Sequence, residues 1–141
     1  IRDSISPESG KVLKRDIRPL QLRFKDQSIT VNMPGWYADD DDEDAIFSGI
    51  DMKVSDRALN TMKARHFGLL EPDEIKRIRK KLKLTQKEAS EIVGGGTNAF
   101  QKYESGEVLV SRAMSNLLRL LDLRPALLNE LRKAPRADEA A

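Results

Sequence analysis

The spacing of apolar residues changes along the chain, from every second position near the start to helical spacing further on. Three segments alternate apolar with polar residues, as half-buried strands do: residues 12–17, 20–24 and 29–33. Polar residues at positions 25–27 supply a turn between the second and third segments. We therefore predict a hairpin or meander within a small β-rich module at residues 1–50.

A connecting helix is predicted within residues 51–70. Ser55 is expected to cap its first turn, and Gly68 is expected to close its C-terminal end. His66, the single histidine, falls in the last turn. There we expect it to satisfy free carbonyl groups rather than to take part in chemistry.

Residues 71–133 carry the signals of five further helices, expected to begin near Pro72, Thr85, Thr97, Ser111 and Pro125. Thr85 and Glu88 have the spacing of a capping box. The helix capped by Thr97 is expected to cover residues 98–104 and to end at Gly106. The predicted fold class is α+β, with a β-rich module followed by a five-helix domain. Residues 134–141 have little to bury and are expected to be disordered.

Composition excludes several classes of protein. Cysteine is absent, which rules out disulfides, thiol nucleophiles and cysteine-ligated metals. With one histidine, the usual catalytic dyads are nearly excluded too, so we do not expect an enzyme. The chain has no run of 18 apolar residues and its first residues lack the apolar core of a secretory signal. We therefore expect a cytoplasmic protein without a membrane span.

Basic residues are concentrated in the second half of the chain. Residues 1–70 hold 11 basic and 12 acidic residues, whereas residues 71–141 hold 14 and 11. Within residues 74–119 the numbers are 10 and 5. This asymmetry favours a polyanionic partner for the C-terminal half, with an uneven scatter of surface lysines as the alternative.

The second and third helices of this half are short, and a glycine turn at residues 94–96 joins them, as in a helix-turn-helix. Amides of Asn98 and Gln101 suit adenine edges, and Lys102 suits guanine. Tyr103 is expected either to anchor the helix in the core or to reach a phosphate through its hydroxyl. The residues that we assign to DNA binding are Thr85, Gln86, Lys87, Thr97, Asn98, Gln101, Lys102 and Tyr103. The alternative is a set of ordinary exposed polar residues around a glycine linker.

Six consecutive acidic residues occupy positions 39–44. Such a run repels itself, so we predict an exposed loop. A site for a hard cation is the alternative, although the run lacks the spaced ligands and central glycine of a calcium loop. The loop could also mimic nucleic-acid phosphates or meet a basic partner.

Two segments, 84–89 (LTQKEA) and 100–106 (FQKYESG), resemble the Xre/Cro-type helix-turn-helix family. The longer stretch 82–106, together with 117–121 and 125–130, resembles the MqsA/YgiT-type antitoxins of bacterial toxin–antitoxin systems. This resemblance implies a homodimer, formed through the C-terminal domain, that binds a palindromic operator and represses its own operon.

The base-reading asparagine of that family falls on Asn98, and its basic partner falls on Lys102. Arginine is more usual at the second position. Lysine keeps the charge but lacks the planar fork that binds a base edge with two donors.

The resemblance also implies a zinc-binding N-terminal module with two Cys-x-x-Cys pairs. In this chain the corresponding positions hold Ser6, Ser9, Ala38 and Asp41. Neutral hydroxyls and a methyl group cannot replace thiolates at a tetrahedral zinc. We therefore expect a module without zinc or any other cofactor, whether the cysteines were lost naturally or engineered out.

In that family the N-terminal module covers a cognate toxin, usually an mRNA-cleaving ribonuclease. Candidate contact residues are Phe24, Trp36 and Tyr37. A role of Trp36 in filling a small core is the alternative.

The first hypothesis is thus an antitoxin of a type II toxin–antitoxin system that neutralises a toxin and represses its own operon. The second is a stand-alone repressor with a structural or ligand-sensing N-terminal module. A metal-dependent nuclease that uses the acidic run comes last, because the chain lacks a positioned base and a spaced set of carboxylates.

Overall fold

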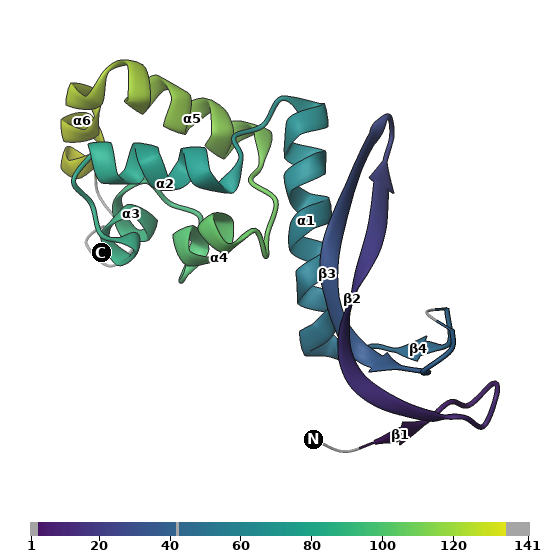
Figure 1. Ribbon diagram of the computed structural model, residues 1–141. Helices are drawn as coiled ribbons and strands as arrows, with labels where there is room; N and C mark the ends of the chain where they lie inside the picture. The colour runs from purple at the N-terminus through teal and green to yellow at the C-terminus, as the bar shows by residue number, and fades with distance from the viewer. Residues whose placement is uncertain (1–2, 42, 135–141) are drawn as a thin grey trace. The chain divides into compact units, whose positions relative to one another are not determined.

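A computed structural model describes residues 3–41 and 43–134, and all of the predicted tail at 134–141 except Ala134 lies outside this part of the chain. The chain divides into two compact units, with the boundary in the sequence after Lys63. The first unit contains a four-stranded antiparallel sheet and the second contains helices (Figure 1). The predicted α+β class is therefore confirmed.

The sheet has the order β1-β2-β3-β4, with β1 at Ser4–Ile5, β2 at Val12–Phe24, β3 at Gln27–Tyr37 and β4 at Ala45–Ile46. The predicted hairpin is confirmed: β2 and β3 pair in one register from Lys14 opposite Tyr37 to Phe24 opposite Gln27. The predicted strands at 12–17 and 20–24 are one strand that passes through Pro19. β1 pairs only with Val12 and Leu13, so Pro19 lies on an edge strand, where proline is tolerated.

The small core of this unit is built around the end of β3. Met33 and Tyr37 are buried there, and the Tyr37 hydroxyl donates a hydrogen bond to the Met33 carbonyl over 2.6 Å. Phe47 packs edge-on against Tyr37 with ring centroids 5.9 Å apart. A Cβ at Gly35 would lie 2.7 Å from the Phe47 ring, so only glycine allows this contact.

Helix α1 runs from Gly49 to Phe67, so the predicted start at Ser55 is wrong. The Ser48 amide donates to the Asp51 carboxylate over 2.9 Å, and the Asp51 amide donates to Ser48 Oγ over 3.1 Å. This reciprocal pair is a capping box, which caps the helix at Ser48, seven residues before the predicted cap. Ser55 instead lies inside the helix, where its hydroxyl donates to the Met52 carbonyl.

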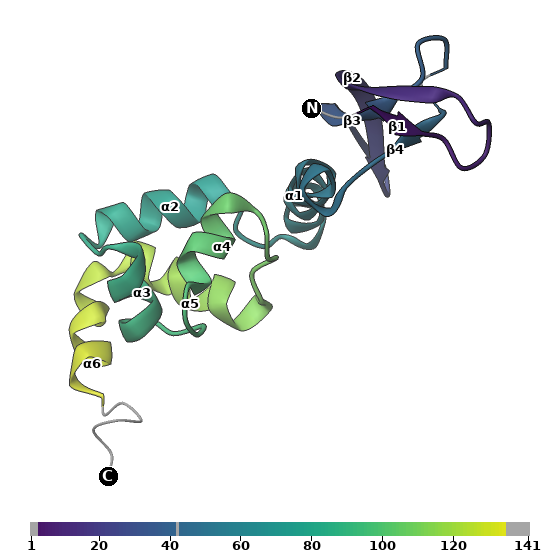
Figure 2. The ribbon, with the colours of Figure 1, turned by 90° about the horizontal axis from the view of Figure 1, so that it is seen from below.

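The second unit contains α2 (Pro72–Lys81), α3 (Gln86–Ile92), α4 (Ala99–Ser105), α5 (Arg112–Leu123), a 3-10 turn η1 (Pro125–Leu127) and α6 (Leu128–Lys133). These helices pack around a common core, as Figure 2 shows. The predicted caps Thr85 and Ser111 and the predicted end at Gly106 are confirmed. Thr97 as a cap is wrong: the N-cap of α4 is Asn98, whose left-handed backbone (φ 61°) turns the chain into the helix.

An ion pair in the first unit joins β2 to the first turn of α1. Arg15 donates from both terminal nitrogens to the Asp51 carboxylate over 2.9 and 3.0 Å, and the Asp51 side chain is nearly fully buried. The hydrogen bonds from Arg15 lower the pKa of Asp51 from 3.8 to about 2. The Arg15 guanidinium also lies 4.5 Å from the ring centre of Trp36, the single tryptophan. Trp36 fluorescence should therefore report on this ion pair.

Replacement of Asp51 by asparagine tests this ion pair through its pH dependence. Because the folded pKa is below the unfolded value, the contribution of Asp51 is complete above pH 4 and is lost as the pH falls toward 2. The shift corresponds to about 2 kcal/mol. Asp51→Asn should lower the unfolding free energy by about that amount at neutral pH, with a smaller difference near pH 2. Urea unfolding followed by Trp36 fluorescence measures both effects.

The control is Asp16→Asn, because Asp16 pairs with Arg18 on the surface and should contribute little. Acid-unfolding curves for wild type and Asp51→Asn that run parallel from pH 6 to pH 2 would contradict the prediction.

Candidate nucleic-acid interface

The turn between α3 and α4 is built from three glycines with positive φ. Gly94, Gly95 and Gly96 have φ values of 114°, 103° and 93°. A Cβ at Gly95 would lie 2.9 Å from both Ala99 Cβ and the Tyr103 hydroxyl, whereas the other two glycines face open space. Only glycine at this position therefore lets α4 pack closely against the turn.

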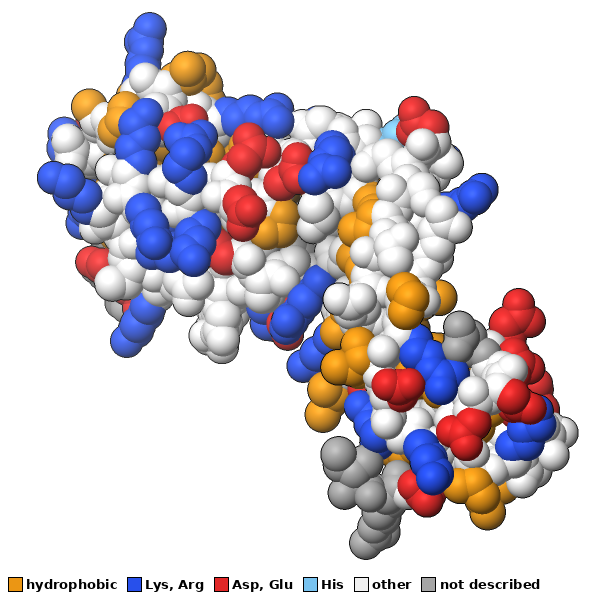
Figure 3. All heavy atoms as spheres, in the orientation of Figure 1, with side chains coloured by type: hydrophobic (Ala, Val, Ile, Leu, Met, Phe, Trp, Pro, Cys, Tyr) orange, Lys and Arg blue, Asp and Glu red, His pale blue; other side chains and the backbone are white. Residues whose placement is uncertain are grey.

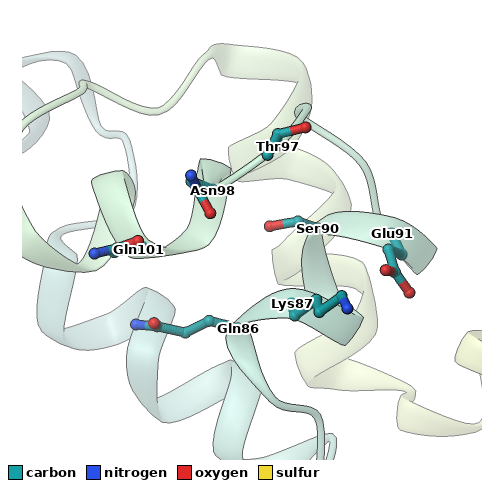
Figure 4. Close-up of a pocket in the computed structure, with 7 residues that line it drawn as sticks. All are labelled: Gln86, Lys87, Ser90, Glu91, Thr97, Asn98 and Gln101. Carbon is teal, nitrogen blue, oxygen red and sulfur yellow. The ribbon is translucent and has the colours of Figure 1, made fainter.

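An open hollow of about 430 Å³ lies between these two helices (Figure 4). Its seven lining residues are Gln86, Lys87, Ser90, Glu91, Thr97, Asn98 and Gln101. All seven side chains are polar, and five of them were among the eight residues assigned to DNA binding from the sequence. The other three, Thr85, Lys102 and Tyr103, do not line it.

Three side chains at the start of α4 are free to bind a ligand. Asn98 makes no capping hydrogen bond from its side chain. Asn98, Gln101 and Lys102 are exposed, and none of their side chains forms a hydrogen bond or ion pair with any residue that the structure describes. Two amides and one ammonium group therefore stand unpaired on one short helix.

The predicted residues near the start of α3 take part in local contacts. Thr85 Oγ1 accepts a hydrogen bond from the Glu88 amide over 3.1 Å, and Glu88 accepts one from the Thr85 amide over 2.9 Å. This completes the predicted capping box. Gln86 donates from Nε2 to Glu104 over 3.3 Å. The Thr85 hydroxyl can still donate its own proton to a phosphate.

The structure places the Tyr103 ring in the core, with 9% of the residue exposed. It packs edge-on against Phe100 with ring centroids 5.6 Å apart. The anchoring interpretation therefore fits the ring. The Tyr103 hydroxyl forms no hydrogen bond with the described residues, yet it is not a fully buried polar atom. The phosphate contact of Tyr103 stays a prediction.

A buried ion pair that was not predicted from the sequence supports this surface. Arg79 of α2 donates to both Glu104 oxygens over 2.8 and 2.9 Å, and the two side chains are only 12% and 5% exposed. Arg79 also donates to the Leu84 carbonyl. The hydrogen bonds with Glu104 raise the pKa of Arg79. The only signal in the sequence is that Arg79 falls on the buried side of α2, beside Ile75 and Ile78.

Basic side chains gather over the helical unit (Figure 3). Arg77 and Lys81 are paired with Asp122 over 2.9 and 3.0 Å, and these hydrogen bonds hold the pKa of that carboxyl well below its usual range. Within residues 3–41 and 43–134, the lysines that form no ion pair include Lys76, Lys80, Lys83, Lys87 and Lys102. These five charges are available to a polyanion.

Comparison with known proteins identifies the family. The family model for the "antitoxin component of bacterial toxin-antitoxin system, MqsA" matches residues 7–132. The chain belongs to the MqsA antitoxin family. Antitoxin MqsA of Escherichia coli (strain K12) is 57% identical over 61 residues, which are 43% of this chain and 47% of that relative. The match thus spans about half the length of the relative.

The residues at the implied zinc-ligand positions make contacts of another kind in this structure. Ser6 Oγ and Ser9 Oγ donate to the two oxygens of Asp44, each over 2.5 Å, and these bonds lower the pKa of Asp44. Ala38 offers only a methyl group, and Asp41 is exposed. Among the described residues no group of three or more histidines, cysteines or acids could hold a metal. The residues present do not fit zinc.

The three residues proposed to contact a toxin differ in exposure. Tyr37 is only 4% exposed and belongs to the core, so its ring offers little surface to a partner. Phe24 and Trp36 are half-buried. Trp36 packs beneath Arg15, whereas Phe24, at the end of β2, has Lys25 and Lys63 about 6 Å from its ring.

Within the described residues of this MqsA-family chain, no helix is long and apolar enough to cross a membrane.

Proposed function

We propose that this chain is an antitoxin of a type II toxin–antitoxin system, that it binds a cognate toxin, and that it represses its own operon by sequence-specific DNA binding in the bacterial cytoplasm. The observation that carries the DNA-binding part is the unpaired, exposed set Asn98, Gln101 and Lys102 on α4. An exposed amide that has no partner in the protein breaks no internal hydrogen bond when it binds DNA. Such an amide can pair with the edge of a base.

In this proposal α4 enters the major groove with its first residues toward the bases. The amides of Asn98 and Gln101 each present one donor and one acceptor, which match N7 and N6 of adenine. Lys102 donates to O6 or N7 of guanine as a point charge, without the two-donor geometry of arginine. The free lysines and the hydroxyls of Thr85 and Thr97 bind phosphates, which fixes the register without reading sequence.

An apolar surface on α5 supports a homodimer. Leu120 and Leu123 are 55% and 78% exposed on this helix, and Leu127 of η1 is 41% exposed. Large exposed leucines close together favour association. A second copy of the chain is the partner that we propose, because a two-fold dimer presents two α4 helices to the two halves of a palindromic operator.

Asn98→Ala should separate specific from non-specific DNA binding. On labelled DNA from upstream of its own gene, we expect the variant to lose affinity by roughly 1–3 kcal/mol, because one base contact is removed. On random DNA its affinity and its salt dependence should equal those of wild type, because the phosphate contacts are unchanged. Titrations at two salt concentrations measure the affinity and its salt dependence. The mass of the complex gives the number of protomers on each site, which we expect to be two.

The matched control is Asn32→Ala, an exposed asparagine on β3 of the first unit whose side chain forms no hydrogen bond with the described residues. It should bind like wild type. If wild type binds every sequence alike with the same steep salt slope, the basic surface is a non-specific electrostatic patch and operator reading is wrong.

For the toxin we propose a small basic ribonuclease, bound by the first unit. Exposed acidic residues of the loop after β3, such as Asp39 and Asp41, would complement a basic nuclease. Phe24 supplies an aromatic contact. The proposed activity includes no catalytic step and no cofactor.

Co-expression in bacteria tests the toxin part. The full chain should restore growth to cells that express the toxin encoded beside its gene. Phe24→Ala should weaken the purified complex about tenfold, as the loss of one aromatic contact of about 1.4 kcal/mol requires. Asn98→Ala is the control and should restore growth as wild type does. No rescue and no complex with any adjacent gene product would favour the alternative, a stand-alone repressor.

A further inference from the structure

The first turn of α4 is capped from a neighbouring helix. An N-cap side chain ordinarily accepts a hydrogen bond from the amide two or three residues later, which satisfies one of the free amides of the first turn. Asn98 is the N-cap of α4, but its side chain makes no such bond. The Phe100 amide, two residues later, instead donates to Ser90 Oγ of α3 over 3.3 Å.

The backbone of Asn98 explains why its own side chain does not cap. N-cap residues usually have extended backbone, as Thr85 and Ser111 do with ψ near 160°. Asn98 has φ 61° and ψ 18°, a left-handed conformation that asparagine tolerates better than most residues. The side-chain amide of Asn98 is therefore left exposed at the hollow that Ser90 also lines (Figure 4).

We propose that Ser90 is a positioning residue. It accepts the hydrogen bond that caps α4, so the side-chain amide of Asn98 stays free to bind a base while the first turn of the helix stays fixed. This inference rests on the proposed DNA-binding function. It assigns to α3 a role in recognition that needs no contact between Ser90 and DNA. Ser90 acts through the orientation of α4, and its loss should be felt only where Asn98 binds a specific base.

A double-mutant cycle on the full chain tests this role. Ser90→Ala should weaken operator binding roughly fivefold, the factor that a typical cap is worth, and should leave binding to random DNA unchanged. The double variant Ser90→Ala/Asn98→Ala should bind the operator no more weakly than Asn98→Ala alone. Ser90→Thr keeps the hydroxyl and should restore binding. Hydrogen exchange of the Phe100 amide should be faster in Ser90→Ala without DNA present.

Additive losses, or an unchanged Phe100 amide in Ser90→Ala, would overturn the role of Ser90 and leave the proposed function intact. A separate outcome concerns the function itself: if Asn98→Ala binds the operator as wild type does, operator reading by Asn98 is wrong, and the role of Ser90 is wrong with it.

The Ser6 loop of the first unit is closed by hydrogen bonds within the loop. The Ser6 side chain is buried, and its Oγ accepts hydrogen bonds from the amides of Glu8 and Ser9, each over 3.3 Å. The Gly10 amide donates to the Ser6 carbonyl over 3.0 Å, and the Ser6 amide donates to the Lys11 carbonyl over 2.9 Å. The loop is thus closed around one hydroxyl oxygen.

Asp44 joins this loop to the segment that follows β3. Its two carboxylate oxygens accept one hydrogen bond each from Ser6 and Ser9, which lie 38 and 35 residues away in the sequence. The Ala38 amide donates to the Asp44 carbonyl over 3.1 Å. One residue therefore contacts both segments that carry the zinc-ligand positions, Ser6 and Ser9 on one side and Ala38 on the other.

We infer that the Asp44 carboxylate, bound by Ser6 and Ser9, takes the structural place of the zinc ion that the family resemblance implies. A carboxylate can accept from both hydroxyls at once, whereas serine hydroxyls are poor ligands for zinc. This Ser6–Asp44–Ser9 contact fastens the two segments with hydrogen bonds alone. It stands independently of DNA and toxin binding.

The test uses the purified full chain and Trp36 fluorescence during urea unfolding. Asp44→Asn should lower the unfolding midpoint, because an amide offers one acceptor and faces a hydroxyl with its NH₂ group. Asp40→Asn is the matched control: Asp40 accepts from Lys11 on the exposed side of the same loop and should change the midpoint little. In a Ser6→Ala/Ser9→Ala background, Asp44→Asn should have no further effect.

Metal dependence gives the second measurement. The chain should contain no stoichiometric zinc by elemental analysis, and neither EDTA nor equimolar zinc should shift the midpoint. Bound zinc, a shift with EDTA, or equal midpoints for Asp44→Asn and Asp40→Asn would each overturn the inference.

Discussion

The buried ion pair between Arg79 and Glu104 is the interaction on which the helical unit depends most. It joins α2 to α4 through two hydrogen bonds, and the same Glu104 carboxylate accepts from Gln86 of α3. Removal of one partner from such a buried pair leaves an unpaired charge, which typically costs about 3–5 kcal/mol. A hydrophobic pair of the same volume would pack as well, but it would not orient Gln86. The pair therefore fixes the geometry of the α3–α4 surface more than it adds stability.

Local signals in the sequence located the helices but not all of their first residues. Thr85 and Ser111 were correct caps because each is followed by a helix that has no competing start nearby. Ser55 was wrong as a cap because another capping pair, Ser48 and Asp51, begins about two turns earlier and satisfies the first amides of the helix. Thr97 was wrong for a different reason. Asn98 adopts a left-handed conformation with φ 61° and turns the chain into α4, so the helix begins one residue later than predicted.

The sequence pointed to exposed residues of the candidate site but not to the residues that hold them in place. Gln86, Asn98 and Gln101 line one hollow, as residues chosen for the chemistry of their amides and their place beside a glycine turn. Ser90 and Glu104 could not be found in this way. Their partners, Phe100 and Arg79, lie 10 and 25 residues away, and no periodicity connects them. Asp44 was seen only as part of an acidic run, because a pattern of like charges gives no indication of which carboxylate turns inward.

In both units a hydrogen bond from a residue distant in the sequence holds a loop or a helix start in place. In the helical unit the first turn of α4 must be capped while Asn98 stays unpaired, and a hydroxyl from α3 accepts the Phe100 amide. In the sheet unit the core is small, and the Ser6 loop is joined to the segment after β3 by the Asp44 carboxylate. This carboxylate accepts hydrogen bonds from the hydroxyls of Ser6 and Ser9. Small modules of this kind usually depend on a metal or a disulfide. A chain without cysteine can form neither a disulfide nor a thiolate zinc site, and in this unit the Arg15–Asp51 ion pair and the Ser6–Asp44–Ser9 contact supply long-range links between its segments.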